Sequence, residues 1–306
     1  MGYRCAGDGK AGIWFVYKMN SFPAAWLDLR EPADVAARAP ELVKWLSEWS
    51  GRYEHVTVVD LGAGTGSCLR AIAPHMGSRQ SWRLIDRSGV LLDEAVKRLS
   101  KWAHQRSLSA RVEQNVWRCI GEISNYSVVF EEQDLATGPV DSGSVVDLVT
   151  VSAVLDLVSK EWCTNLARWC SEKGAALYTC LNYDGQFHFA PSHPDDSLVR
   201  SVVNTHQRTD KGMGPALGSS AIEVLAEALS AAKYQFVIAP SPWLLGSDSS
   251  ALQTALVRDW SDLVFRQGGM YAARVSRWRN FRMAAIKARQ SHLSVGHVDL
   301  WARPKV

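Results

Sequence analysis

Short apolar runs alternate with helical patterns along the first half of the chain. Apolar residues recur at helical spacing from Pro32 to Trp49, which predicts a helix with Pro32 in its first turn. The run HVTVVDLG at 55–62 is short, β-branched and bounded by glycine, which is typical of a buried strand. After a glycine-rich stretch, residues 67–73 can form one or two helical turns before Pro74 ends them.

The alternation of strands and helices continues to residue 185. An amphipathic helix is predicted at 91–103 and a tryptophan-rich helix at 161–171. Strands are predicted at 81–86, 126–135, 144–158 and 174–185. Such alternation indicates parallel strands joined by right-handed crossovers, with helices on both faces of an open sheet.

The pattern changes after Gly185. Residues 185–218 are rich in His, Pro, Asp and Gly and are too long for an ordinary connection, so we expect a substrate lid or loop. A helix near 222–229 follows, and a helical region at 250–290 separates two further strands at 234–245 and 294–304. We therefore predict an α/β fold with a doubly wound, mostly parallel, seven-stranded sheet in a single domain from 22 to 306, in which 22–50 form an N-terminal helical cap.

Composition narrows the class of protein. The chain has 306 residues, of which 47% are hydrophobic and 21% charged, as in ordinary globular proteins. Its longest early apolar run is too short for a signal peptide, and no run approaches the ~18 residues of a membrane span, so we expect a cytoplasmic protein with no membrane partner. Because the patterned sequence starts near Phe22, we expect residues 1–21 to be a poorly ordered extension, with Met19 an alternative start to Met1.

Three glycines, Gly62, Gly64 and Gly66, follow a strand that ends in Asp60. Such a turn lets backbone N–H groups approach a ligand at a helix N-terminus. The dinucleotide fingerprint G-x-G-x-x-G fails in both registers, and no Gly-Lys-Ser/Thr follows for a P-loop. Asp86 ends the next strand, where a carboxylate can accept hydrogen bonds from both hydroxyls of a ribose. Loop and carboxylate together indicate an adenosine-containing ligand that need not carry a pyrophosphate.

VVDLGAGTG resembles the first motif of class I S-adenosylmethionine-dependent methyltransferases, position for position at the acid and the three glycines. LIDRS resembles their ribose-binding motif, FEEQDLA their third motif and VDLVTVSAVLDLV their fourth, over about residues 30–182. The resemblance implies S-adenosylmethionine as cofactor and S-adenosylhomocysteine as product, and an antiparallel pair for the last two strands. The cofactor-binding residues that it implies are Asp60, Gly62, Ala63, Gly64, Gly66, Asp86, Arg87, Asp134 (adenine amino group), Leu135 (adenine ring) and Ser152.

Simpler roles stay open for several of these side chains. Asp86 can be a helix N-cap, although Ser88 suits that role better, and Asp134 can be a plain turn carboxylate. Arg30 and Arg38 lie at helical spacing near the entrance of the expected site. Either arginine can hold the methionine carboxylate by a bidentate pair, or simply lie on a solvated helix face.

Methyl transfer from a sulfonium needs a positioned nucleophile and, where necessary, a base to remove its proton. Asp156 and Tyr183 follow predicted strands, at the sheet edge where open α/β sheets bind ligands. The segment NTHQRTDKGMGPALG at 204–218 gathers His206, Asp210 and Lys211 before a glycine-rich bend. We favour His206 as the base, with Asp210 and Lys211 as substrate contacts. The histidines of this region match no common zinc spacing, so we expect no metal.

The segment 204–218, together with WLDLREPAD and VGHVDL, also resembles parts of uncharacterised bacterial methyltransferases, which supplies no substrate. Six basic residues lie at 274–289 without an acidic one. They spread around a helix, so they do not form one basic face that could contact phosphates. We therefore favour a small-molecule O or N acceptor and a monomer or homodimer. The open alternatives are an RNA or tRNA methyltransferase, a non-catalytic S-adenosylmethionine-binding protein and a nicotinamide-dependent oxidoreductase.

Overall fold

The computed structural model of the chain describes residues 22–122, 124–136, 138, 139, 143, 145–267 and 271–305. The expected extension at 1–21 lies outside these residues. In the described part, ten strands form one sheet in the order β3-β4-β5-β2-β1-β6-β7-β10-β8, and β9 pairs with β10. The strands are β1 (Val56–Leu61), β2 (Arg79–Asp86), β3 (Ser109–Glu113), β4 (Val116–Ile120), β5 (Asn125–Glu132), β6 (Leu148–Ser152), β7 (Ala176–Ala190), β8 (Tyr234–Pro240), β9 (Trp243–Leu245) and β10 (His292–Pro304).

The centre of the sheet is parallel, as predicted. β1 pairs in parallel with β2 and β6, β2 with β5, and β6 with β7. Leu61 at the end of β1 lies opposite both Ile85 and Val151, so the residues that follow these strands meet at one edge of the sheet. The predicted antiparallel pair at the other end of the chain is β8 and β10.

The predicted number of seven strands is wrong. β3 and β4 form an antiparallel hairpin beside β5, joined at Gln114 and Asn115, which both have left-handed φ. This hairpin was missed because β3 is short and largely exposed, with only Ala110 and Val112 apolar, and because its turn contains no glycine. β9 has only three residues.

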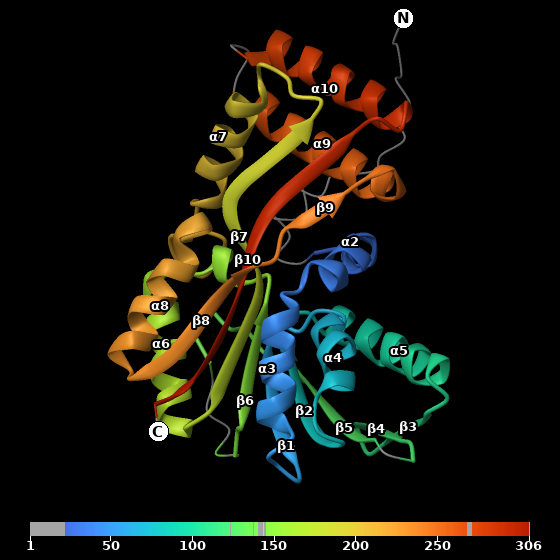
Figure 1. Cartoon of the computed structure of the whole chain (residues 1–306), viewed down its shortest axis with the longest axis vertical. Helices are drawn as coiled ribbons and strands as arrows, with labels where there is room; N and C mark the ends of the chain where they lie inside the picture. The colour runs from blue at the N-terminus through green and yellow to red at the C-terminus, as the bar shows by residue number, and fades with distance from the viewer. Residues whose placement is uncertain are drawn as a thin grey trace, which may run out of the picture.

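Helices cover both faces of the sheet (Figure 1). They are α2 (Ala24–Ala37), α3 (Pro40–Ser50), α4 (Ser67–Ile72), α5 (Gly89–Gln105), α6 (Lys160–Lys173), α7 (Asp196–Gln207), α8 (Ala221–Ala231), α9 (Ser250–Arg266) and α10 (Ala272–Lys287). One apolar core lies under α3, α4 and α5, and a second lies under α6 and α8. A third core belongs to α7, α9, α10, β9 and the far ends of β7 and β10, which we call the outer lobe.

The single helix predicted from Pro32 to Trp49 is wrong. Two helices, α2 and α3, meet at Arg38 and Ala39, whose backbones are extended. Pro40 causes the break, because a proline disfavours helical backbone in the residue before it and suits the first turn of a new helix. Pro32 lies inside α2 instead of opening it.

The prediction of a loop over residues 185–218 is also wrong. β7 continues to Ala190 and pairs with β10 as far as His292, because Phe187 and Phe189 alternate inward as a strand requires. The helix α7 follows and buries Val199. These elements form the outer lobe, which stands above the carboxyl edge of the parallel strands in Figure 1. The predicted helical region at 250–290 is confirmed as α9 and α10.

Candidate active site

The glycine loop after β1 has a backbone that only glycine adopts easily. Gly62, Gly64 and Gly66 have φ of 72°, 53° and 74°. A Cβ on Gly62 would lie 2.7 Å from Cγ2 of Val154, and one on Gly64 would lie 3.3 Å from Cδ1 of Leu27. The loop therefore brings its backbone close to whatever occupies the space beside it.

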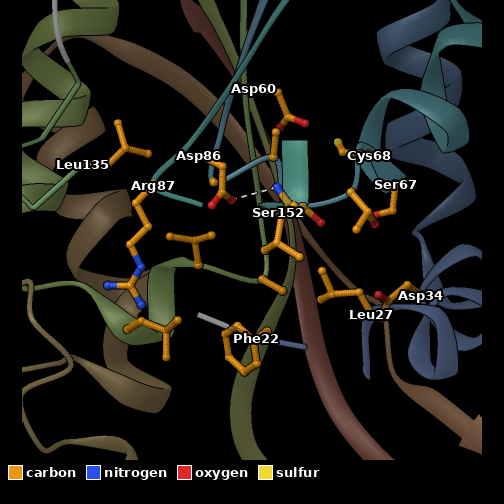
Figure 2. Close-up of a pocket in the computed structure, with 18 of the residues that line it drawn as sticks. Phe22, Leu27, Asp34, Asp60, Ser67, Cys68, Asp86, Arg87, Leu135 and Ser152 are labelled. Atoms are coloured by element: carbon orange, nitrogen blue, oxygen red, sulfur yellow. Dashed lines mark hydrogen bonds between the residues drawn. The ribbon is translucent and has the colours of Figure 1, made fainter. Parts of the chain in front are cut away.

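Two buried carboxylates flank this loop. Oδ2 of Asp86 accepts a hydrogen bond from the backbone N–H of Gly64 at 2.8 Å, the dashed line in Figure 2, and burial raises the pKa of Asp86. Asp60 accepts a hydrogen bond from Oγ1 of Thr150 at 2.7 Å, and burial raises its pKa to about 7. Both carboxylates are thus fixed by the fold at the ends of adjacent strands.

A cavity, which we call the first cavity, opens between the glycine loop and α2. Figure 2 shows Asp60 and Asp86 on one side of it and Phe22 and Leu27 on the other. Of the residues predicted to bind a cofactor, the following line it: Arg30, Asp60, Gly62, Ala63, Gly64, Asp86, Arg87, Asp134, Leu135 and Ser152. Gly66, which was also predicted, does not line the cavity and is the N-cap of α4. The strand-end motifs therefore converge on one space, as the sequence predicts.

Two buried oxygen atoms of this cavity wall have no hydrogen-bond partner among the described residues. They are Oδ2 of Asp60 and Oγ1 of Thr65. A buried polar atom without a partner costs free energy of about 1–3 kcal/mol. The wall therefore fits a ligand that brings its own hydrogen-bond donors.

The two predicted arginines lie in different places. Arg30 lines the cavity and makes a bidentate pair with Asp34 at 2.8 and 3.1 Å. Arg38 is buried and donates to Sγ of Cys180 at 2.6 Å, and it does not line the first cavity. Only Arg30 is therefore placed to contact a ligand there.

A second cavity adjoins the first one on the side of the outer lobe. Both cavities are lined by Phe22, Arg30, Ala153 and Leu157, so they share a wall. The other residues that line the second cavity are Trp26, Asp156, Leu181, Tyr183, Val203, Gln207, Trp243, Leu256, Asp259, Trp260, Val295 and His297. These side chains come from α2, the turn after β6, β7, α7, β9, α9 and β10.

The backbone is strained where the two cavities meet. Ala153 and Leu181 have left-handed φ of 54° and 59°, although neither is glycine. Their N–H groups are held by the carbonyl of Cys180 and by Oδ1 of Asp299. Strained backbone that the surrounding structure holds in place is common at functional sites, which is consistent with a binding role here.

Asp156 and Tyr183, two of the predicted catalytic residues, line the second cavity. Burial raises the pKa of Asp156 to about 6, although the charges of Arg30 and Lys211 oppose this shift. The hydroxyl of Tyr183 donates to Oδ1 of Asn204 at 3.0 Å, and burial raises the pKa of this phenol above its ordinary value. At neutral pH, Asp156 is therefore a carboxylate close to its pKa, which suits a proton acceptor.

The favoured base, His206, does not line either cavity. Its Nε2 lies 3.2 Å from Nζ of Lys211, and burial and this ammonium lower its pKa to about 4. Asp210 is exposed and accepts the N–H of Gly212 in a local turn. The structure thus brings Asp156 and Tyr183 to the cavity but not His206, Asp210 or Lys211.

Sequence reasoning missed most of the second cavity. Asp259 is a polar position on a helix that showed no motif, whereas Gln207 and His297 lie in the segments 204–218 and VGHVDL but were given no role. The abundance of tryptophan was the one available signal: the chain has thirteen, and Trp26, Trp243 and Trp260 line the cavity. Spacing along the sequence could not show which tryptophans would meet.

In the described part of the chain, no group of three or more His, Cys, Asp or Glu side chains is placed to hold a metal ion. Among the same residues, no helix is both long enough and apolar enough to cross a membrane.

No family model matches the chain, and no curated protein matches it. Among solved structures, it is similar to S-adenosylmethionine-dependent methyltransferases bound to S-adenosylhomocysteine from Thiobacillus denitrificans (17% identity, TM-score 0.42, 92% of this chain and 100% of that chain) and Geobacter sulfurreducens (16%, 0.43, 94% and 100%). It is also similar to the cyclase SpnF (16%, 0.41, 97% and 98%).

Proposed function

We propose that the chain binds S-adenosylmethionine in the first cavity and transfers its methyl group to a nucleophilic O or N atom of a small molecule in the second cavity. The observation that carries this proposal is the shared wall of Phe22, Arg30, Ala153 and Leu157. A cavity suited to an adenosine ligand opens there onto a second cavity that contains a carboxylate near its pKa. Two adjoining spaces of this kind are what a two-substrate transfer requires.

Different residues of the first cavity would hold different parts of the cofactor. Asp86 is the ribose ligand, and Asp134 and Leu135 lie on the side of the cavity assigned to adenine. The orphaned oxygens of Asp60 and Thr65 would accept hydrogen bonds from the bound molecule. The bound cofactor supplies a methyl group already activated as a sulfonium, so the chain needs neither a metal nor a covalent intermediate.

The residues of the second cavity would position the acceptor and remove its proton. Asp156 accepts the proton, because its pKa of about 6 keeps it ionised at neutral pH while leaving it basic enough to act. Tyr183 is held by Asn204 and forms part of the wall. Trp243 and Trp260, both more than nine-tenths buried, exclude water from the reacting groups.

The surroundings favour a small molecule over RNA as the acceptor. Three of the basic residues of α10 are already engaged: Arg274 with Asp195, Arg279 with Asp262 and Arg282 with Asp196. Arg282 is buried. Because these three charges are already paired within the protein, they are less available to phosphates, which weakens the case for α10 as a nucleic-acid surface.

Calorimetric titration with S-adenosylmethionine and S-adenosylhomocysteine tests the proposal. We expect binding by the wild type, and a loss of about tenfold in Asp86→Asn because a charged hydrogen-bond acceptor is lost. Asp93→Asn, which removes an exposed carboxylate of α5, is the matched control and should bind normally. If NAD⁺ or NADP⁺ binds instead of either sulfur ligand, the proposal is wrong.

A further inference from the structure

An irregular pairing of β7 with β10 lies beside the second cavity. Val295 pairs with Phe187, whereas His297 pairs with Tyr183, so β7 carries extra residues between these two pairs. Such a bulge bends its strand and re-aims the neighbouring side chains. Tyr183 and His297 both line the cavity, and the ring centre of His297 lies 6.2 Å from that of Tyr183 and 4.8 Å from that of Trp243. The imidazole of His297 is therefore held in the cavity wall by contacts with two other rings.

The imidazole of His297 is neutral and offers one hydrogen-bond acceptor. Burial, and the nearby charge of Arg30, lower its pKa to about 3, so it carries no charge at pH 7. Its Nδ1 lies 3.1 Å from the carbonyl oxygen of Val295, an acceptor, so this nitrogen carries the hydrogen. Nε2 is then an acceptor, and it has no hydrogen-bond partner among the described residues. A molecule in the second cavity can supply the missing donor.

Gln207, at the end of α7, provides a second acceptor. It lines the same cavity, and its Oε1 is buried without a hydrogen-bond partner in the part of the chain that the structure describes. Asn204 lies one turn earlier on α7 and accepts the hydroxyl hydrogen of Tyr183 at 3.0 Å, so this phenol has no hydrogen left for Gln207. A buried acceptor without a partner costs about 1–3 kcal/mol, which a ligand with a donor group would offset.

The charged side chains around this cavity act on one another. Arg30 makes its bidentate pair with Asp34, and the charges of Arg30 and Lys211 both act on Asp156. Asp259 also has an interaction of its own within the protein. Because positive and negative groups offset one another here, charge alone selects neither a cation nor an anion. The neutral acceptors on His297 and Gln207 therefore distinguish ligands more sharply than the charged groups do.

Much of the remaining wall of the second cavity is apolar. Its buried apolar side chains, each no more than 9% exposed, include Trp26, Leu181, Val203, Leu256 and Val295. A ligand gains about 25 cal/mol for each Å² of apolar surface that it buries against such a wall. Small-molecule sites commonly combine an apolar lining with a few polar groups at fixed positions, which orient the ligand. The second cavity has this composition.

We propose that His297 and Gln207 select the methyl acceptor by accepting hydrogen bonds from O–H or N–H groups of a molecule whose apolar body packs against Trp26 and Leu256. This inference rests on the proposed function and names its substrate class, apolar compounds with hydrogen-bond donors, such as phenols and indoles. A site with buried acceptors rejects an analogue without the donor, because the acceptors then lose water and gain no partner. The methyl ether of a phenol is such an analogue, so the same contacts favour release of an O-methylated product.

Matched pairs of compounds with and without the donor test this inference by binding alone. The probes are 4-ethylphenol with 4-ethylanisole, 2,7-dihydroxynaphthalene with 2,7-dimethoxynaphthalene, and 5-hydroxyindole with 5-methoxy-1-methylindole. Each is titrated calorimetrically into the protein saturated with S-adenosylhomocysteine. We expect at least one donor compound to bind about tenfold or more tightly than its methylated partner. If no donor compound in the set binds more tightly than its partner, the inference is overturned.

Three variants locate the preference for the donor compound. His297→Phe keeps a ring but removes Nε2, and Gln207→Met keeps the length of the side chain but removes the amide oxygen. The preference should fall about tenfold in each variant, because one acceptor is lost. His292→Phe, at an exposed position of the same strand that lines neither cavity, should keep the full preference. An undiminished preference in both of the first two variants would overturn the inference.

Binding of S-adenosylhomocysteine separates this test from a failure of the proposed function. Its affinity is measured for the wild type and every variant before any probe is added, which also shows that each variant is folded. If S-adenosylhomocysteine does not bind the wild type, the proposed function fails. If it binds but no donor compound is preferred, only the acceptor class and the roles of His297 and Gln207 are wrong.

Discussion

The two cavities of this protein meet at a shared wall but are built in different ways. The first is formed largely by backbone turns directly after β1, β2 and β6, whose ends lie in register. The second is formed by side chains from seven separate segments, of which β7 and β10 meet only through long-range pairing. A site made of backbone turns needs particular residues at close spacing, whereas a site made of assembled side chains leaves no such pattern.

The largest expected effect separates chemistry in the second cavity from binding in the first. Asp156→Asn keeps the shape of the side chain but removes the proposed proton acceptor, so kcat for the proposed methyl transfer should fall about 1000-fold. The affinity for S-adenosylhomocysteine, measured by calorimetry, should change by less than about twofold because Asp156 does not line the first cavity. An unchanged kcat would remove Asp156 from the mechanism.

The second-largest expected effect is a loss of ligand affinity in the first cavity. Gly64→Val forces a β-branched residue into a left-handed φ of 53° and places its side chain against Leu27. We expect the affinity for S-adenosylhomocysteine to fall about 100-fold, because backbone strain of this kind costs about 1–3 kcal/mol and would displace the loop from the ligand.

The matched control for this variant is Gly174→Ala. Gly174 also has a left-handed φ, of 65°, but nothing lies within 4 Å of its Cβ position at the end of α6. Its substitution should cost about 1 kcal/mol of stability in thermal unfolding and leave ligand affinity unchanged. Equal losses of affinity in both variants would show that strain, and not the cavity, explains the effect.

The pH dependence of the rate tests the proposed role of Asp156 in a second way. Burial raises the pKa of Asp156 to about 6, and only the ionised form accepts a proton. The rate of methyl transfer should therefore fall about tenfold per pH unit below about pH 6 and level off above it. Steady-state rates between about pH 5 and 8 check this, and the inflection should be missing in Asp156→Asn.

The smallest effect concerns the residue that the sequence favoured as base. His206→Ala should change kcat by less than about twofold, because His206 lies outside both cavities and contacts Lys211 instead. Steady-state kinetics at neutral pH measure this. A loss as large as that of Asp156→Asn would show that the end of α7 takes part in catalysis.

Much of the fold could be predicted because its signals are local. The parallel centre of the sheet follows from apolar runs that alternate with helical patterns, and α9 and α10 from their periodicity. The break between α2 and α3 was also present in the sequence, since Pro40 disfavours helical backbone at Ala39. The hairpin of β3 and β4 was not, because an exposed edge strand needs no apolar face.

The error at 185–218 has a different cause. Its composition of His, Pro, Asp and Gly is typical of a loop, yet β7 runs on to Ala190. Pairing with β10 and the stacking of Phe187 on Trp260, with ring centres 4.1 Å apart, stabilise this strand. Both partners lie more than 70 residues further along the chain, so tertiary packing overrode the local preference.

The sequence by itself determined the backbone of the first cavity. A left-handed loop needs glycines at 62, 64 and 66, and a carboxylate at the end of the next strand needs only the register of a parallel pair. The tertiary structure alone decided the second cavity and the surroundings of Asp156, the proposed base. Asp156, Asp259 and Trp243 are far apart in sequence and acquire a common environment only when the outer lobe packs over the sheet, because burial and charge are properties of neighbours in space.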